Sequence, residues 1–387
     1  MKRKTNSILI FICTSLFMFS LIGSRPLIPI YSNHLGATNL QIGAIIALFS
    51  LLPLFMAIPL GKLIDRIGSK TPLVVSVLIA SLSLVIPYFL STLLGVYISQ
   101  VLSGLSQLVF VLAMQSYIGG NRKYKIRDYY IAIFSIGVAI GSFIGPLVSG
   151  ILTDRVGYSV TLGALGALII LALPFIPFIK GKETSIQKEE FSNKKSSDLF
   201  LISDLRKAFI VSAIVLLAKD IYLAFFPLLA MDKGLSATMI GLLISLNALA
   251  GILIRTLLPY LVKKYSTNII ISYSIMCAGI AFLTIPMLTN SFLLGFVSFL
   301  LGLSLGIGQP LSISITINSL PPDRVGEGLG LRLSINKLTQ VVMPLLLGGI
   351  SALGGIASIF YVSGFLIISA SLNTKNKSKE DNNSVNL

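Results

Sequence analysis

The sequence predicts an all-α membrane protein with twelve transmembrane helices arranged as two six-helix repeats. Three observations predict this fold class. Of the 387 residues, 55% are hydrophobic and only 11% are charged, and the mean hydropathy is +0.91. Apolar runs of about 20 residues, long enough to cross a bilayer as a helix, recur along the whole chain. The second half of the sequence also repeats the first.

Polar breaks divide the chain into twelve predicted spans. Six lie in the first half, at 8–31, 40–60, 71–90, 94–118, 129–151 and 159–179. Six lie in the second half, at 208–230, 237–261, 268–288, 292–317, 328–352 and 355–372. An even number of spans places both termini on the same side of the membrane.

Basic residues mark one side of this predicted topology. They lie near the N-terminus, in alternate loops, in the segment 180–207 and in the tail: Lys2, Arg3, Lys4, Lys62, Arg66, Lys70, Arg122, Lys123, Lys125, Arg127, Lys263, Lys264, Lys375, Lys377 and Lys379. The opposite loops carry little charge beyond His34, Asp154, Arg155, Asp232 and Lys233. Because cytoplasmic loops are enriched in Lys and Arg, we predict cytoplasmic termini in a multi-pass protein of a bacterial-type plasma membrane. Topology then explains the net charge of +16, and we expect no nucleic-acid partner.

An internal repeat divides the chain into two halves. At an offset of 198 residues, "PIYSNHLGATNLQIG" (29–43) aligns with "PLLAMDKGLSATMIG" (227–241). We predict an N-terminal half at 1–179, a cytoplasmic linker at 180–207, a C-terminal half at 208–372 and a disordered tail at 373–387. Parallel repeats of this kind are a transporter architecture, in which the substrate lies between the halves near the midplane.

A charged stretch, "GKLIDRIGSK" (61–70), lies between the second and third spans of an otherwise apolar chain. Its Gly61, Asp65, Arg66 and Gly68 resemble the G-x-x-x-D-R-x-G-[RK]-[RK] signature of the major facilitator superfamily. Length, span number, repeat and loop position agree with this family, so the resemblance covers essentially the whole chain. It implies a gating role for these four residues.

The charges of this loop have a physical use at a gate. Asp65 is expected to face the positive N-terminus of a neighbouring helix, here the one that begins near Glu327. Arg66 is expected to pair with Asp128. The alternative is a loop that only sets the topology.

The fifth span carries a second pattern, "GVAIGSFIGPLVSG" (137–150). Gly137, Gly141 and Gly145 are four residues apart, and Pro146 and Gly150 follow. This pattern resembles the antiporter motif of the superfamily's drug and metabolite exporters, with Ser149 where a glycine is common. Glycines at this spacing give a flat surface for close helix contact, and the proline bends the helix. The sequence therefore predicts a gate and favours export, whereas ordinary small-residue packing is the alternative.

The fourth span departs from the family pattern. The superfamily's proton antiporters carry an arginine four residues before a glycine, and this chain has Gln100 there. Proton coupling through that arginine is therefore not carried over. Gln107 shares a helical face with Gln100 and is a candidate for the wall of the substrate cavity; an interhelical hydrogen bond is an equal alternative.

Charge within a membrane span is costly and usually functional, and we select the charged residues that lie deepest in the predicted spans as site candidates. They are Arg25, Lys219, Asp220, Arg255 and Lys337. Asp220 is the only carboxylate deep in a span, so we predict that it couples transport to protons. A structural buried pair is the alternative. Arg25 and Arg255 have a second reading as side chains that reach the membrane interface.

The predicted substrate-binding residues are either cationic or neutral and polar. The cationic ones are Arg25, Lys219, Arg255 and Lys337, and the neutral ones are Gln107, Asn336 and Gln340. A cationic cavity favours anionic or zwitterionic solutes over lipophilic cations. Because Arg25 and Asp220 lie in spans that line the cavity in the superfamily, they are expected to meet across it.

The sequence motifs that could indicate catalysis are incomplete. "GLSLG" (302–306) fits a serine hydrolase elbow, but the sole histidine lies in an outer loop. We therefore expect no enzyme activity, cofactor or metal. The sequence predicts a secondary transporter that exports small amphiphilic metabolites or drugs by alternating access, with protons as the coupling ion. An importer or lipid flippase of the same fold, or a membrane sensor that does not transport, are the alternatives.

Overall fold

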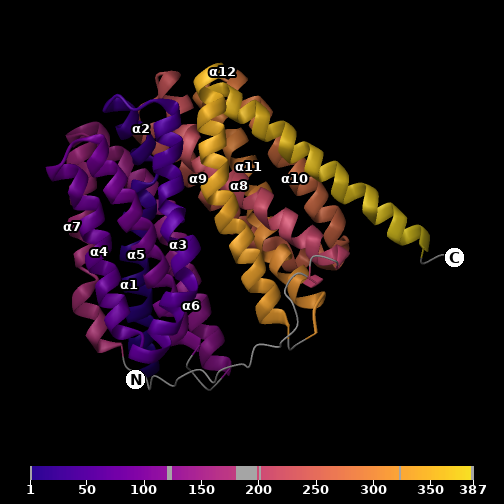
Figure 1. The fold of residues 1–387 in the computed structure, drawn as a ribbon, viewed down its shortest axis with the longest axis horizontal. Helices are drawn as coiled ribbons and strands as arrows, with labels where there is room; N and C mark the ends of the chain where they lie inside the picture. Colours follow the sequence, from indigo (N-terminus) through magenta and orange to yellow (C-terminus); the bar gives the residue numbers. More distant parts are fainter. Residues whose placement is uncertain (1, 120–123, 180–197, 200–201, 322–323, 385–387) are drawn as a thin grey trace. The chain divides into compact units, whose positions relative to one another are not determined.

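The computed structural model describes residues 2–119, 124–179, 198–199, 202–321 and 324–384, and these residues are helical apart from short connections. The first part of the chain forms α1 (Lys2–Ser24), α2 (Leu27–His34), α3 (Asn39–Ile67), α4 (Lys70–Phe89), α5 (Leu93–Gly119), α6 (Tyr124–Val156), α7 (Tyr158–Ile170) and the 3₁₀ helix η1 (Leu173–Phe178). The second part forms α8 (Ser203–Asp232), α9 (Ala237–Lys264), α10 (Thr267–Thr284), the 3₁₀ helix η3 (Ile285–Met287), α11 (Ser291–Asn318) and α12 (Val325–Ser384). Figure 1 shows these helices along the chain.

Eleven of the described segments are long and apolar enough to cross a membrane, against twelve predicted spans. The last of them, Glu327–Leu372, has 46 residues and contains two predicted spans. A straight helix of this many residues, at about 1.5 Å per residue, would be roughly 69 Å long, which is more than twice the hydrocarbon thickness of a bilayer. The backbone leaves helical geometry inside it at Gly355, with φ 73° and ψ 174°. The segment therefore consists of two apolar helices that meet at a bend.

The chain divides into two compact units. The first contains Met1–Glu189 and Ala230–Ser245, and the second contains Glu190–Leu229 and Leu246–Leu387. The first unit thus takes in the end of α8 and the first residues of α9, which the sequence assigned to the C-terminal half. Most of the predicted linker lies outside the described residues. Helix α12 is described as far as Ser384, and the disordered tail expected from residue 373 stays a prediction.

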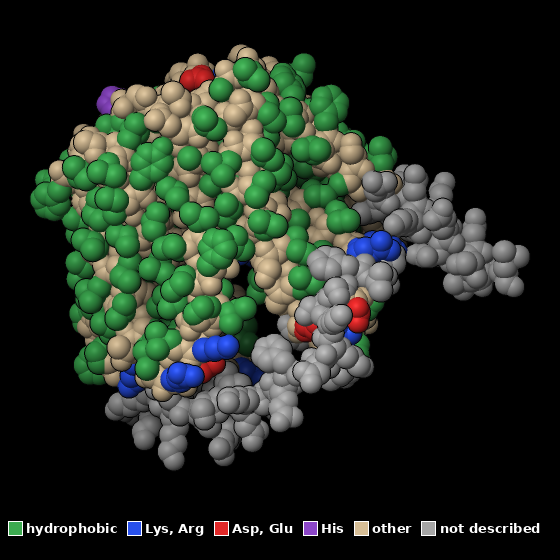
Figure 2. Space-filling view, in the orientation of Figure 1, with side chains coloured by type: hydrophobic (Ala, Val, Ile, Leu, Met, Phe, Trp, Pro, Cys, Tyr) green, Lys and Arg blue, Asp and Glu red, His purple; other side chains and the backbone are tan. Residues whose placement is uncertain are grey.

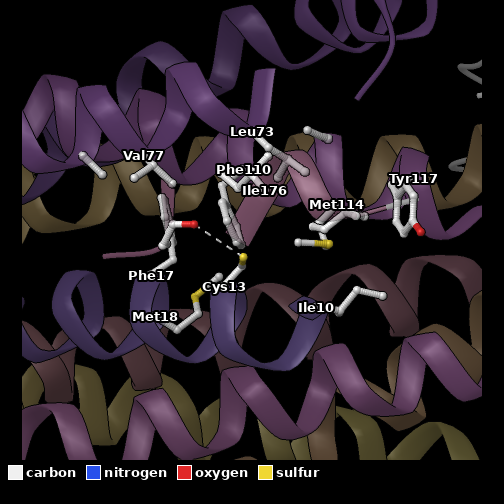
Figure 3. Close-up of a cluster of buried hydrophobic side chains, with 14 of the residues drawn as sticks. Ile10, Cys13, Phe17, Met18, Leu73, Val77, Phe110, Met114, Tyr117 and Ile176 are labelled. Carbon is white, nitrogen blue, oxygen red and sulfur yellow. Dashed lines mark hydrogen bonds between the residues drawn. The ribbon is translucent and has the colours of Figure 1, made fainter. Parts of the chain in front are cut away.

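The core of the first unit is an apolar cluster from α1, α4, α5 and η1 (Figure 3). The rings of Phe17 and Phe110 stack with centroids 3.9 Å apart. The Cys13 thiol donates a hydrogen bond to the carbonyl oxygen of Ala172, so this cysteine is a buried packing residue. In this unit α1 packs chiefly along α6, and α4 lies between α5 and α7.

The sides and the ends of the helices expose different kinds of side chain (Figure 2). Hydrophobic side chains cover the flanks of the helices, as expected for surfaces that face lipid. Lys and Arg side chains gather at the end of the first unit where the chain begins.

Helix ends are closed by local hydrogen bonds. At the start of α3, Thr38 and Gln41 form a capping box, in which each side chain accepts from the other's backbone N–H. The Asn290 side chain accepts from the backbone N–H groups of Phe292 and Leu293 at the start of α11. These caps satisfy backbone donors that an α-helix leaves free.

Candidate functional site

The glycines of α6 lie directly against α1. A methyl group at Gly137 would meet Thr14, one at Gly141 would meet Met18 and the backbone of Phe19, and one at Gly145 would overlap the carbonyl oxygen of Phe19. The sequence pattern therefore corresponds to a surface of close backbone contact, and larger side chains would separate the two helices.

The end of α6 makes a similar contact with the start of α9, within the first unit. A methyl group at Gly150 would overlap the carbonyl oxygen of Ala237, and one at Gly241 would overlap that of Pro146. The Ser245 hydroxyl donates a hydrogen bond of 2.5 Å to the carbonyl oxygen of Phe143. This seam joins the helix predicted to contain the antiporter motif to the first two turns of α9.

Asp154 closes the seam at the end of α6. Its Oδ1 accepts from the backbone N–H of Ala237 at 3.0 Å, and its Oδ2 accepts from that of Thr238 at 2.8 Å. The Ser236 hydroxyl oxygen accepts from Met239 N–H at 3.3 Å. All three donors at the start of α9 are thus satisfied, and the carboxylate also faces the positive end of the helix dipole.

The sequence analysis did not select Asp154, although a signal was present. The stretch "GILTDRVG" (150–157) repeats "GKLIDRIG" (61–68) at both glycines, the aspartate and the arginine. The backbone repeats as well: Gly68 has φ 82° and ψ 172°, and Gly157 has φ 83° and ψ 170°. Both turns require the left-handed region that glycine adopts without a steric penalty. The first unit therefore contains the charged turn twice.

In the first copy of this turn the charged residues are exposed. The Ser116 hydroxyl donates to Asp65 Oδ1 at 3.4 Å. Asp128 Oδ1 lies 3.7 Å from Arg127 Nε, and the expected pairing of Asp128 with Arg66 stays a prediction. The expected contact of Asp65 with the helix that begins near Glu327 joins the two units and stays a prediction.

Asp220 is buried in α8 of the second unit, with 8% of its surface exposed. The Gln340 side chain of α12 donates to its Oδ2 at 2.6 Å. Lys219, the next residue, is exposed, and Lys337 is half-buried. The structure thus brings together two predicted site residues that the sequence had selected for separate reasons.

A polar cluster lies about two helical turns from Asp220 along α8. Arg332 Nη1 donates to the Ser212 hydroxyl at 2.8 Å and to Gln309 Oε1 at 3.0 Å. Asn336 Nδ2 donates to the same hydroxyl at 2.8 Å. Gln309 Nε2 donates to the backbone carbonyl of Ser212 at 3.0 Å. We call these four residues the Arg332 cluster.

Arg332 was missed by the sequence analysis because it lies near the start of a predicted span, where an arginine can reach water. The structure buries it, with 5% of its surface exposed. The available signal was the spacing of Arg332, Asn336 and Gln340, which are four residues apart and therefore share one helical face.

The remaining predicted cavity residues make other contacts. The Arg25 guanidinium lies 4.3 Å above the Phe49 ring in the first unit, a cation–π geometry. Its expected meeting with Asp220 joins the two units and stays a prediction. Arg255 Nε donates to the carbonyl oxygen of Gly306 at 3.2 Å. Gln107 is half-buried in α5.

Comparisons with a family model, with related sequences and with solved structures all find transporters. The sequence model of the Major Facilitator Superfamily matches residues 10–336 and 208–381. An MFS-type transporter of Methanocaldococcus jannaschii is 27% identical over 377 residues, covering 95% of this chain and 96% of that protein. Multidrug resistance protein 2 of Bacillus subtilis is 22% identical over 385 residues, covering 95% of each. The solved structure of the nucleoside transporter NupG is similar in fold, with a TM-score of 0.81 at 14% identity, covering 96% of this chain and 99% of that one.

Proposed function

The chain belongs to the Major Facilitator Superfamily and is a membrane transporter, and we propose that it exports small amphiphilic solutes in exchange for protons by alternating access. In this proposal the chain crosses a bacterial-type plasma membrane twelve times, with Gly355 at the turn between the last two spans. Both termini lie in the cytoplasm, where the basic loops favour them. The substrate binds near the midplane, between the two six-helix halves.

The contact between α6 and α9 supports an outer gate in this proposal. Close backbone approach at Gly150 and Gly241 leaves no room for a solute along this seam, and Asp154 holds the start of α9. Opening the outer side then requires these hydrogen bonds to break. We assign the charged turn around Asp65 the same task at the inner side.

Export is favoured over import by the glycine row of α6. Its resemblance to the antiporter motif of exporters is matched by backbone contact with α1 at Gly141 and Gly145. The relative from Bacillus subtilis that carries the name multidrug resistance protein 2 aligns along 95% of this chain, which supports efflux as the direction.

One observation carries the assignment of the coupling residue: Asp220 is a buried carboxylate inside a span, and the described structure gives it a neutral hydrogen-bond donor, Gln340. Charge inside a membrane span is costly. A proton that binds Asp220 from the outer side removes this cost and makes reorientation of the empty carrier easier. Release of the proton to the cytoplasm restores the charge, and the substrate then binds for the outward step.

The test uses purified protein in liposomes with an imposed pH gradient. Uptake into inside-out vesicles is measured for a cationic dye, an anionic metabolite and a zwitterionic metabolite. The variant is Asp220→Asn, and the control is Asp232→Asn, which changes an exposed carboxylate at the end of the same helix.

We expect uphill uptake in the parent protein and in Asp232→Asn. Asp220→Asn should lose uphill uptake but retain counterflow exchange of substrate, because the carrier can still reorient when loaded. Uphill uptake in Asp220→Asn at the parent rate would refute the coupling role. Solute movement that ignores the pH gradient in every variant would refute proton exchange itself.

A further inference from the structure

The Arg332 cluster contains two buried polar atoms, Arg332 Nε and Asn336 Oδ1, that have no hydrogen-bond partner among the described residues. Arg332 and Asn336 keep only 5% and 3% of their surfaces exposed. Buried polar atoms are nearly always paired in folded proteins. One donor and one acceptor are therefore left without partners, one helical turn apart on the same face of α12.

Within the described part of the chain, the charge of Arg332 also has no carboxylate to compensate it. Its hydrogen-bond acceptors, Ser212 and Gln309, are neutral. Arg324, near the start of the same helix, shows the usual arrangement, because its Nε lies 2.9 Å from the carboxylate of Glu327. Isolated charge inside a membrane protein is costly and is retained where it binds an ion or a substrate.

The internal repeat shows that the fold does not need this cluster. At the offset of 198 residues, Arg332, Asn336 and Gln309 correspond to Phe134, Val138 and Val111. These three residues pack against the apolar core of the first unit. The same pair of helices is therefore held together by hydrophobic contacts in one half and carries a buried cation in the other.

We propose that the Arg332 cluster binds the carboxylate of the transported solute, an inference that rests on the proposed transport function. A carboxylate accepts hydrogen bonds from guanidinium N–H groups in a bidentate geometry. These charge-assisted bonds are stronger than the bonds that Arg332 now makes to neutral oxygens, so the guanidinium exchanges partners when the anion arrives.

The second unpartnered atom specifies the group beside the carboxylate. Asn336 Oδ1 is an acceptor and needs an N–H or O–H donor. A carboxylate with a hydroxyl or amino group on the adjoining carbon supplies an acceptor for Arg332 and a donor for Asn336 together. The solute class is therefore a small 2-hydroxy- or 2-aminocarboxylate with an apolar remainder, in place of a lipophilic cation.

The test measures binding without transport. Purified protein in detergent is heated while its fluorescence is followed; the chain has 13 tyrosines and no tryptophan. The probes are mandelate, phenylacetate, which lacks the hydroxyl group, and benzyl alcohol, which lacks the carboxylate. The variants are Arg332→Met, Arg332→Lys and Asn336→Ala. The control is Arg324→Gln, which changes an arginine with an intramolecular carboxylate partner.

We expect mandelate to raise the melting temperature of the parent protein and of Arg324→Gln, since a ligand that binds only the folded state stabilises it. Arg332→Met should weaken mandelate binding at least 10-fold and leave the effect of benzyl alcohol unchanged. Arg332→Lys should give a smaller loss. Asn336→Ala should reduce the preference for mandelate over phenylacetate.

The melting temperature without ligand separates binding from a structural role. Because Arg332→Met removes an uncompensated buried charge, the variant should melt at the parent temperature or above. A lower melting temperature with mandelate binding retained, or no folded protein from either Arg332 variant, would assign a structural role and overturn the proposal. An unchanged parent melting temperature with mandelate would overturn it as well. Failure of proton-driven transport alongside Arg332-dependent mandelate binding would refute only the proposed function.

Discussion

The hydrogen bonds of Asp154 make a measurable prediction about the outer gate. Asp154→Asn keeps one acceptor oxygen but turns an NH₂ group toward the second backbone N–H of α9. The variant therefore loses one of the bonds of 3.0 and 2.8 Å to Ala237 and Thr238, and it also loses the attraction of a full negative charge for the helix N-terminus. Because Asp154 is exposed, the values for helix caps and dipoles at a surface apply. Together they give about 1–2 kcal/mol.

This loss should shift the equilibrium toward the open outer gate by about 5–30-fold. The reporter is a cysteine in place of Ser245, which is fully buried in the seam and bonds to Phe143. The background carries Cys277→Ser, since Cys277 is exposed and Cys13 is buried. A membrane-impermeant maleimide added from the outer side should label the reporter about 5–30-fold faster in Asp154→Asn than in the parent.

The matched control is Arg155→Gln, which changes the neighbouring exposed charge. It should leave the labelling rate unchanged. Equal rates in Asp154→Asn and the parent would refute the role of the carboxylate. A similar increase in Arg155→Gln would show that the charge of the loop matters, in place of the two hydrogen bonds to α9.

Three further predictions concern the first unit. Asp65→Asn should lower transport into inside-out vesicles at least 10-fold while the amount of inserted protein stays constant; normal transport would remove Asp65 from the inner gate. Gly141→Ala should destabilise the folded protein by about 1–3 kcal/mol, because the added methyl group meets Met18 and the α1 backbone; Gly61→Ala, which meets nothing within 4 Å, is the control, and equal melting temperatures for the two variants would contradict the close contact. Thr38→Ala should cost about 1 kcal/mol through loss of the capping box of α3, seen as faster amide exchange at the first turn of that helix; unchanged exchange would show that the cap does not hold this turn.

The helical class and most spans were predictable because apolar runs of bilayer length report burial in lipid directly. The repeat also located turns, since the aligned Gly36 and Gly234 have φ values of 82° and 79°. The last two predicted spans both lie in α12, which bends at Gly355. That bend matches Gly157 across the repeat, although the aspartate and arginine of the turn are absent from the second copy.

The contacts of the site were less predictable. Asp220 was selected as the only deep carboxylate, but its donor, Gln340, was selected because it lies near Lys337. A sequence does not show which helix end faces a carboxylate, so the contact of Asp154 with α9 required the folded structure. Arg332 was missed for a different reason: its distance from the end of a span does not determine whether its side chain turns to water or to the interior.

The duplicated charged turn has a consequence for speed. In the proposed mechanism the Asp65 carboxylate stabilises the state that is closed at the inner side, and the Asp154 carboxylate stabilises the state that is closed at the outer side. Removing one of them changes how the population is divided between the two states. Removing both by similar amounts leaves that division nearly unchanged but lowers the barrier to leaving either state. In this mechanism the common strength of the two contacts sets the rate at which the two states interconvert. The difference between their strengths sets which state is more populated.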